Sequence, residues 1–225
     1  MNILVCVPIR PDLNKTLKEK CFKLIEGLPA ANPEHTISTH FDESKIPNNI
    51  GGTIKKNARN KWLSEVDLNK WDYLLWIDAD VVDYPLDMPT KLINFNPTGI
   101  SAPLILIENS KKFYDYGAFV IHNRGDLPSN DKTIKRVRTF PPYWEKEPIE
   151  RIVPMDGVGT VTMIPSWIYK NGVKYTDTKF TEHYSICQAV RKAGHSVVCN
   201  RDIIAYHADL PKYEGEKWHW NTNFI

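Results

Sequence analysis

The sequence feature that most constrains the fold is an apolar and aromatic run from Tyr73 to Ile77, followed at once by acidic residues. A short continuous apolar run predicts a β-strand that is buried on both faces, as in a parallel α/β sheet. Asp78 and Asp80 come directly after the run, with Ala79 between them. In such sheets, ligands lie beyond the carboxyl ends of the strands, which is where these two carboxylates are expected.

The two carboxylates are open to two interpretations. Hard oxygen ligands at the end of a strand suit Mg²⁺ or Mn²⁺, and such a metal can bridge and neutralise a substrate diphosphate. An Asp-x-Asp sequence is also common, and the same residues could form only a turn or a helix N-cap. The remaining segments of the chain must decide between the two.

The segments before this strand alternate between strand and helix patterns. Asn2 to Val7 is a strand-like run ended by Pro8, and Lys15 to Gly27 has helical periodicity with a glycine that could end the helix. A second strand is expected over Ile37 to Phe41, with Asp42 directly after it. Strand, helix, strand is the opening of a Rossmann-like sheet.

The later segments continue the pattern. Pro103 lies inside one expected strand and indicates an edge strand or a bulge. The expected helices are Thr53 to Leu63, Asp87 to Phe95 and Phe180 to Gly194, and the expected strands are Thr98 to Ile107, Phe113 to His122 (as a pair), Ser196 to Cys199 and Ile203 to His207.

Composition and charge narrow the functional class. The 225 residues are most simply one domain over 1–211, with 212–225 as a tail or a linker to further sequence. A formal net charge of +2 gives no electrostatic argument for nucleic acid. No signal peptide is visible, and no apolar run approaches the roughly 20 residues that span a bilayer. The four cysteines lack metal-site spacing and are expected to be buried thiols, so a cytoplasmic protein is predicted.

Five further residues are candidates for a site, each with an ordinary structural alternative. Arg10 and Arg59 could contact phosphate or simply face solvent. Asp156 precedes two glycines that could admit a ligand or form a β-bulge. Glu182 opens a predicted helix, where it could only favour the helix dipole. His207 ends the last predicted strand, where it could be structural or bind Mn²⁺.

As an ordered set, these features resemble the GT-A fold glycosyltransferases of the family 2 type, over roughly residues 2 to 207. The short form also resembles viral glycosyltransferase domains that decorate a capsid, which implies the host cytoplasm. The matching features are Val7-Pro8, Asp42, Ala58-Arg59-Asn60, the strand into Asp78-Ala79-Asp80, Asp156-Gly-Val-Gly, Glu182 opening a helix that ends Arg191-Lys-Ala-Gly194, and His207.

The resemblance implies a fold and an activity. The expected fold is an α/β, GT-A (Rossmann-like) domain with a central, mostly parallel sheet flanked by helices and a smaller acceptor-side subregion. The expected activity is metal-dependent sugar transfer from a UDP-sugar to a glycan hydroxyl, on a glycan or glycoprotein acceptor, with inversion. Further domains of a longer polypeptide are expected partners, whereas nucleic acid and a membrane span are not.

The resemblance also implies roles for residues at the donor site. Asp42 and the Pro8 to Arg10 loop would hold uracil and ribose, and Arg59 would support the nucleotide and diphosphate. In Asp78-Ala79-Asp80, the second carboxylate would bind Mn²⁺ or Mg²⁺ between the α- and β-phosphates. The first would either share the metal or reach the ribose. His207 would be a further metal ligand.

The catalytic base departs from the family pattern. In the family the base is usually the Asp of a Glu-Asp pair at a helix start, whereas this chain has Glu182-His183. The base therefore lies among Glu182, Asp156 and His183, with Glu182 as the first choice.

Two other functions fit parts of the sequence. A phosphatase of the haloacid dehalogenase type would use Asp78 as its nucleophile, although its acidic strand usually opens the fold. A nucleotide-sugar-binding module without catalysis would explain the absence of the second acidic residue at the helix start. A nucleotidyltransferase would need a glycine-rich loop after the first strand, and Pro8-Ile-Arg-Pro11 is not one.

Overall fold

The computed structural model of the chain describes residues 1–9, 13–43, 52–111, 114, 120–121, 138–139, 152–176 and 182–208. Arg10, the tail 212–225 and most of the segment 113–148 lie outside these residues, so predictions about them are not tested. The smaller acceptor-side subregion likewise stays a prediction.

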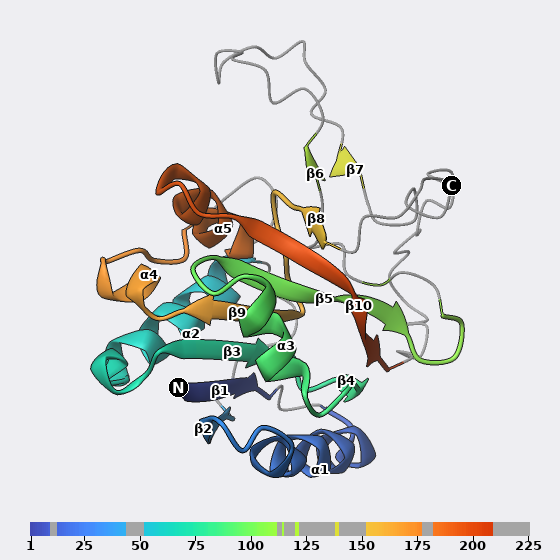
Figure 1. The fold of residues 1–225 in the computed structure, drawn as a ribbon. Coiled ribbons are helices and arrows are strands. Elements are labelled where there is room, and N and C mark those ends of the chain that lie inside the picture. The colour runs from blue at the N-terminus through green and yellow to red at the C-terminus, as the bar shows by residue number, and fades with distance from the viewer. Residues whose placement is uncertain are drawn as a thin grey trace.

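The described residues form a mixed α/β structure around one large sheet (Figure 1). Strands β1, β2, β3, β5 and β10 run in one direction, because β9 is antiparallel to both β3 and β5 and β10 is parallel to β5. This confirms the expected fold class of a mostly parallel sheet flanked by helices. The order is β2 (Thr36–Asp42), β1 (Asn2–Pro8), β3 (Tyr73–Ile77), β9 (Val161–Pro165), β5 (Ile100–Ile107), β10 (Val197–His207) and β4 (Val81–Asp83), with β8 (Ile152–Pro154) also paired to β10.

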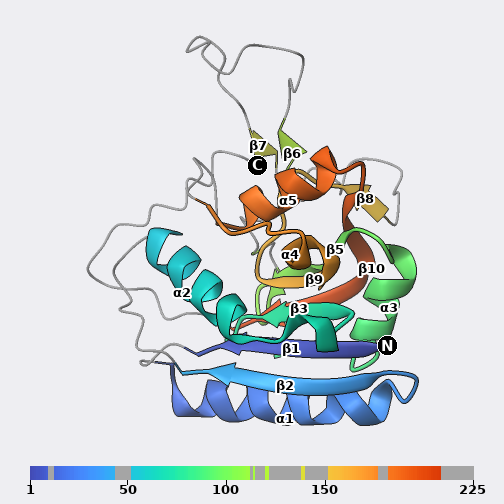
Figure 2. The same ribbon diagram turned by 90° about the vertical axis from the view of Figure 1, so that its left-hand side faces the viewer.

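Helices cover both faces of the sheet (Figure 2). The first face carries α1 (Lys15–Ala31) and α3 (Met88–Phe95), and the second carries α2 (Gly52–Glu65), α4 (Trp167–Lys170) and α5 (Glu182–Lys192). A short 3₁₀-helix η1 (Leu68–Lys70) precedes β3, and β6 (Val120–Ile121) pairs with β7 (Arg138–Thr139) apart from the main sheet.

The central strands are buried on both faces because alternate side chains enter two different cores. In β1, Ile3, Val5 and Val7 pack with α1 and α3, whereas Leu4 and Cys6 pack with α2, α4 and α5. The strand β3 is divided in the same way and all of its residues are buried. The continuous apolar pattern of Tyr73 to Ile77 therefore follows from a two-sided core, as predicted.

The prediction that Gly27 ends the first helix is wrong. Helix α1 continues to Ala31 and includes Pro29, because Leu28 is fully buried and Asn32 fixes the helix end. The Asn32 amide donates to the carbonyl oxygens of Leu28 (2.7 Å) and Leu86 (2.8 Å). A buried amide with these partners is a stronger stop signal than the glycine.

The last two predicted strands are one strand. Strand β10 runs without interruption from Val197 to His207, and its pairing register with β5 shifts between Asn200 and Ile204. Pro103 pairs opposite Asn200 at this irregularity, so the expected bulge is confirmed, but β5 is an interior strand rather than an edge.

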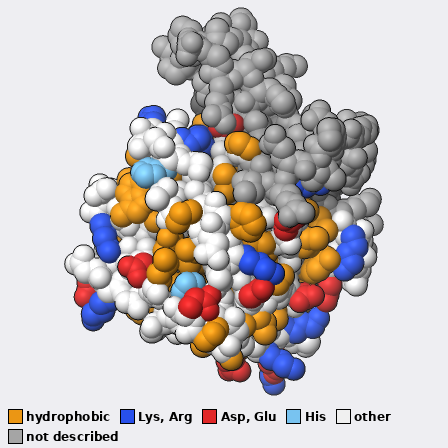
Figure 3. Space-filling view, in the orientation of Figure 1, with side chains coloured by type: hydrophobic (Ala, Val, Ile, Leu, Met, Phe, Trp, Pro, Cys, Tyr) orange, Lys and Arg blue, Asp and Glu red, His pale blue; other side chains and the backbone are white. Residues whose placement is uncertain are grey.

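The distribution of surface charge and the length and apolarity of the helices bear on possible partners. On the face shown in Figure 3, the Lys and Arg side chains of the described residues alternate with Asp and Glu and form no continuous basic patch. Within the described part of the chain, no helix combines the length and apolarity needed to cross a membrane.

A substitution at Gly99 tests the close backbone approach between the segments that precede β5 and β10. A Cβ atom at Gly99 would lie 2.1 Å from the carbonyl oxygen of Ser196, a backbone atom that also accepts from the Ile100 amide at 3.0 Å. We expect Gly99→Ala to lower the free energy of unfolding by about 3 kcal/mol in urea titrations, because a backbone atom cannot move aside easily. In Gly27→Ala the new methyl group meets only the flexible end of Leu86 and should leave stability equal or higher. Equal stability of the two variants would contradict this account.

Candidate functional site

The strands β1, β2, β3 and β10 end at the same edge of the sheet, and the predicted site residues gather there. Pro8 and Asp42 are paired in register at the ends of β1 and β2, and the Ile9 amide donates to the Asp42 carbonyl oxygen at 2.7 Å. This places Pro8 and Asp42 side by side at this edge. Arg10 lies outside the described residues.

The Asp78-Ala79-Asp80 segment forms the tight turn between β3 and β4, and backbone hydrogen bonds tie it to two other strands. The Asp78 amide donates to Thr160 at the start of β9 (3.0 Å), and the Ala208 amide donates to the carbonyl oxygen of Asp80 (2.9 Å). Ala79 is buried in the core. The acidic residues therefore do form a turn. That turn fixes both carboxylates at the edge of the sheet where β1, β2, β3 and β10 end, which we call the carboxyl edge.

Asp80 and His207 form a buried pair. The Nε2 atom of His207 lies 3.0 Å from Asp80 Oδ1. The side chain of His207 is 1% exposed and that of Asp80 is 12% exposed. The Nδ1–H group of His207 donates to the carbonyl oxygen of Ala208 at 2.7 Å, since a carbonyl can only accept. This fixes the ring with Nε2 toward the carboxylate.

The electrostatics of this pair favour a positive charge between the two side chains. Burial opposes protonation of His207, but the hydrogen bond to Asp80 and its charge outweigh burial, so the pKa of His207 lies above its usual value. A place that attracts a proton between an imidazole nitrogen and a carboxylate oxygen has the donor atoms to attract a metal cation.

Tyr114 is part of this arrangement, and sequence reasoning missed it. Its ring stacks on the imidazole of His207, with centroids 3.6 Å apart and planes at 15°. Its amide donates to Ile105 on β5 at 3.0 Å. Nothing in the sequence distinguishes Tyr114 from the other nine tyrosines, because its role depends on where the segment after β5 turns.

Arg59 on α2 is buried between two carboxylates. Its Nη2 atom lies 3.6 Å from Asp78 Oδ1 and its Nε atom 4.0 Å from Glu182 Oε1. The guanidinium carbon lies 4.5 Å from the ring centroid of Trp76 and 5.7 Å from that of Tyr175. Burial would lower the pKa of Arg59, but Tyr175, Asp78 and Glu182 raise it overall, so the side chain is a fixed cation.

The residue after Arg59 explains why Tyr175 lies beneath the guanidinium. The Asn60 amide donates to the Tyr175 carbonyl oxygen at 2.8 Å, and its oxygen accepts from the Tyr175 amide at 2.9 Å. The tyrosine hydroxyl is also 2.8 Å from that of Tyr169. Arg59 is thus a buried cation, and the next residue, Asn60, holds one of its aromatic neighbours through two hydrogen bonds. The sequence analysis did not predict this role of Asn60.

The start of α5 contains two of the three candidate bases. Glu182 is 12% exposed at its side chain and faces Arg59, as described above. His183 is buried against the edge of Tyr175, with ring centroids 5.7 Å apart, and its Nε2 atom lies 3.8 Å from Glu182 Oε1. Of the two, Glu182 is the one that adjoins the Asp78 side of the site through Arg59.

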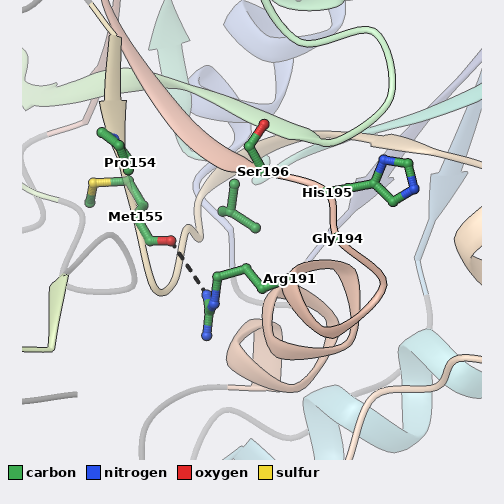
Figure 4. Close-up of a pocket in the computed structure, with 7 residues that line it drawn as sticks. Pro154, Met155, Arg191, Gly194, His195 and Ser196 are labelled. Carbon is green, nitrogen blue, oxygen red and sulfur yellow. Dashed lines mark hydrogen bonds between the residues drawn. The ribbon is translucent and has the colours of Figure 1, made fainter. Parts of the chain in front are cut away.

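Asp156, the third candidate base, is held inside the protein. Its side chain is 1% exposed, and its Oδ1 atom lies 3.4 Å from Arg191 Nη2. Arg191 also donates to the carbonyl oxygen of Met155 at 3.4 Å (Figure 4) and to that of Asp156. This geometry favours a structural role, in which Asp156 ties the loop after β8 to the end of α5, over proton transfer.

A surface hollow of about 330 Å³ lies beside Arg191, but it is not at the carboxyl edge (Figure 4). It sits at the beginning of β10, whereas His207 is at the other end of the same strand. It is lined by Pro154, Met155, Arg191, Gly194, His195, Ser196 and Val197.

The side chains at the carboxyl edge fit a divalent cation that is shared with a phosphate ligand. In the part of the chain that the structure describes, no three His, Cys, Asp or Glu side chains form a ready metal cluster. Asp80 and His207 supply two donors, and Asp78, whose side chain is 37% exposed, lies in the same turn. Mg²⁺-like ions are commonly held by one or two protein ligands together with waters and substrate phosphates.

The buried pair of Asp156 and Arg191 predicts a stability effect. Asp156→Asn removes the negative charge but keeps the shape, and leaves Arg191 with a weaker partner. We expect the free energy of unfolding to fall by about 2 kcal/mol in urea titrations. The matched change Asp67→Asn affects an exposed pair with Lys70 and an exposed hydrogen bond from the Asn69 amide, which an asparagine oxygen can still accept, and should alter stability very little. A stability of Asp156→Asn equal to that of wild type would contradict the structural role.

Comparisons with known proteins give structural neighbours only. No family model and no curated protein matches the chain. Among solved structures, GalNAc-T7 with UDP, GalNAc and Mn²⁺ is similar at 14% identity and a TM-score of 0.48, over 96% of this chain and 44% of the other. A glycosyltransferase involved in glycosylation of the major capsid of PBCV-1 is similar at 9% identity and 0.38, over 76% and 63%.

Nucleotidyltransferases are also among the neighbours. The 2-C-methyl-D-erythritol 4-phosphate cytidylyltransferase of Thermus thermophilus is similar at 12% identity and a TM-score of 0.39, over 89% of both chains. This chain spans less than half of the GalNAc-T7 chain. The structural neighbours are thus glycosyltransferases and cytidylyltransferases, and with all three TM-scores below 0.5 they assign neither a family nor a substrate.

Proposed function

We propose that this chain is a metal-dependent glycosyltransferase of the GT-A type, which transfers a sugar from a UDP-sugar to a glycan hydroxyl with inversion. The observation that carries the proposal is the buried pair of Asp80 and His207 at the carboxyl edge of the sheet. The chain supplies a carboxylate and an imidazole there, from the ends of two strands far apart in sequence, and the sequence resemblance assigns a metal to the same two residues.

Asp80 and His207 would hold Mn²⁺ or Mg²⁺, and Asp78 would either share the ion or reach the ribose. The bound ion would neutralise the donor diphosphate and make UDP a better leaving group. The fixed orientation of His207 supports this role, because its Nδ1–H group is held by the Ala208 carbonyl and its ring by Tyr114.

Pro8 and Asp42 would contact the uracil and ribose, and Arg59 would support the diphosphate. The adjacency of Pro8 and Asp42 in the sheet register supports the first assignment. The second is supported by the position of Arg59 next to Asp78, since a guanidinium is well suited to phosphate oxygens.

Glu182 would accept the proton of the acceptor hydroxyl as that hydroxyl attacks the anomeric carbon. Its carboxylate adjoins Arg59, which in turn adjoins Asp78, so donor-side and acceptor-side groups belong to one contiguous cluster.

The resemblance alone supplies the wider setting of the proposal. A glycan or glycoprotein acceptor, further domains of a longer polypeptide and a place in the host cytoplasm of a virus-infected cell are proposed on that basis.

The activity can be tested by release of UDP from a panel of UDP-sugars in the presence of Mn²⁺. We expect wild type to release UDP with at least one sugar and Glu182→Gln to release it about 10²- to 10⁴-fold more slowly, because the proton acceptor is lost. Glu65→Gln, on the exposed end of α2, is a matched control and should behave as wild type.

Two outcomes would contradict the proposal. If wild type binds UDP-sugars and leaves all of them intact, with and without glycan acceptors, the chain is a binding module. If inorganic phosphate is released from phosphate esters and this activity is lost in Asp78→Asn, the chain is a phosphatase.

A further inference from the structure

We propose that Arg59 is a positioning residue for which Glu182 and the donor diphosphate compete, so that donor binding releases Glu182 for its role as base. This inference rests on the proposed function, since it concerns the same site. It adds a coupling between the donor side and the acceptor side that the assignment of separate roles does not contain.

The first observation is that the guanidinium has hydrogen-bonding capacity to spare. Its contacts with Asp78 and Glu182, at 3.6 and 4.0 Å, are longer than a normal hydrogen bond. Its Nη1 atom is buried and, among the residues that the structure describes, has no hydrogen-bond partner. A guanidinium offers five N–H donors, so phosphate oxygens can bind it before Glu182 has moved, and their negative charge then reduces its attraction for the Glu182 carboxylate.

The second observation is that the guanidinium itself is held in place. Trp76 and Tyr175 lie against it, with ring centroids at 4.5 and 5.7 Å. Tyr175 is fixed in turn by two hydrogen bonds to Asn60 on the same helix as Arg59. With the cation held between aromatic rings, a new anionic partner exchanges with an existing one, rather than drawing the arginine away.

The third observation is that one cation serves two carboxylates in a poorly solvated place. The side chains of Arg59 and Glu182 are 8% and 12% exposed, so their charges are only weakly screened. Asp78 has a second possible partner in the donor metal or ribose. The ion pair with Arg59, in contrast, holds the proposed base Glu182 itself. A phosphate that binds Arg59 would therefore weaken the hold on Glu182.

The inference predicts that loss of the Glu182 carboxylate raises the affinity for UDP. Loss of a site residue ordinarily weakens ligand binding, but Glu182→Gln removes the competitor for Arg59 and should tighten the binding of UDP. A purely structural role for the ion pair predicts the opposite, because losing the pair would loosen the start of α5.

The test is calorimetric titration of UDP, with Mn²⁺ present, into wild type, Glu182→Gln, Arg59→Met and the double variant. We expect Glu182→Gln to bind UDP about threefold or more tightly than wild type, and the same substitution to give no gain in the Arg59→Met background. Uridine, which lacks phosphates, should bind equally well to wild type and Glu182→Gln.

Two controls separate this mechanism from general effects. Asp83→Asn, at the exposed end of β4, measures the effect of removing one negative charge elsewhere on the protein and should not reproduce the gain. Circular dichroism and thermal unfolding check that Arg59→Met is folded. If it is not, Arg59→Lys takes its place, and the gain from Glu182→Gln should then shrink because a lysine lacks the fork of N–H donors.

The outcomes are distinct. Wild type that binds UDP while Glu182→Gln binds it equally or more weakly would overturn the inference and leave the proposed function standing. A gain that persists in Arg59→Met, or that appears equally with uridine or Asp83→Asn, would also overturn it. Absence of UDP binding to wild type would overturn the proposed function, and the inference with it.

Discussion

The contact between Asp80 and His207 is the interaction on which the arrangement of the site depends. It joins the turn after β3 to the last residue of β10, and the backbone bond from Ala208 to Asp80 repeats the connection. A buried carboxylate is costly unless it has polar partners, and the imidazole provides one. The pair thus stabilises the closure of the sheet at this edge and at the same time places two metal-ligand types side by side.

The cluster around Arg59 extends this arrangement to the second face of the sheet. A buried cation is tolerated there because two carboxylates and two aromatic rings surround it. Arg59 contacts both the turn after β3 and the start of α5. The donor and acceptor sides of the proposed reaction therefore interact with the same positive charge. This continuity explains why Glu182 is a better candidate base than Asp156, whose partner is Arg191 at the far end of α5.

The sequence predicted the parts of this structure that depend on local pattern. The buried strand into Asp78 and Asp80, the helix opening at Glu182 and the end of the last strand at His207 all follow from hydrophobic periodicity and its interruption. It could not predict features that depend on contacts between distant segments. Gly27 ended no helix because Asn32 finds partners near α3, and Tyr114 and Tyr175 became part of the site only through tertiary packing.

The most direct test of the account is titration of UDP into the protein with Mn²⁺ and, separately, with a chelator, for wild type and Asp80→Asn. The account predicts binding by wild type that requires Mn²⁺ and that falls at least about tenfold in Asp80→Asn, because the carboxylate holds the ion that meets the diphosphate. Binding of equal strength in the chelator, or an Asp80→Asn variant as tight as wild type, would contradict the assignment of this edge as a metal-diphosphate site.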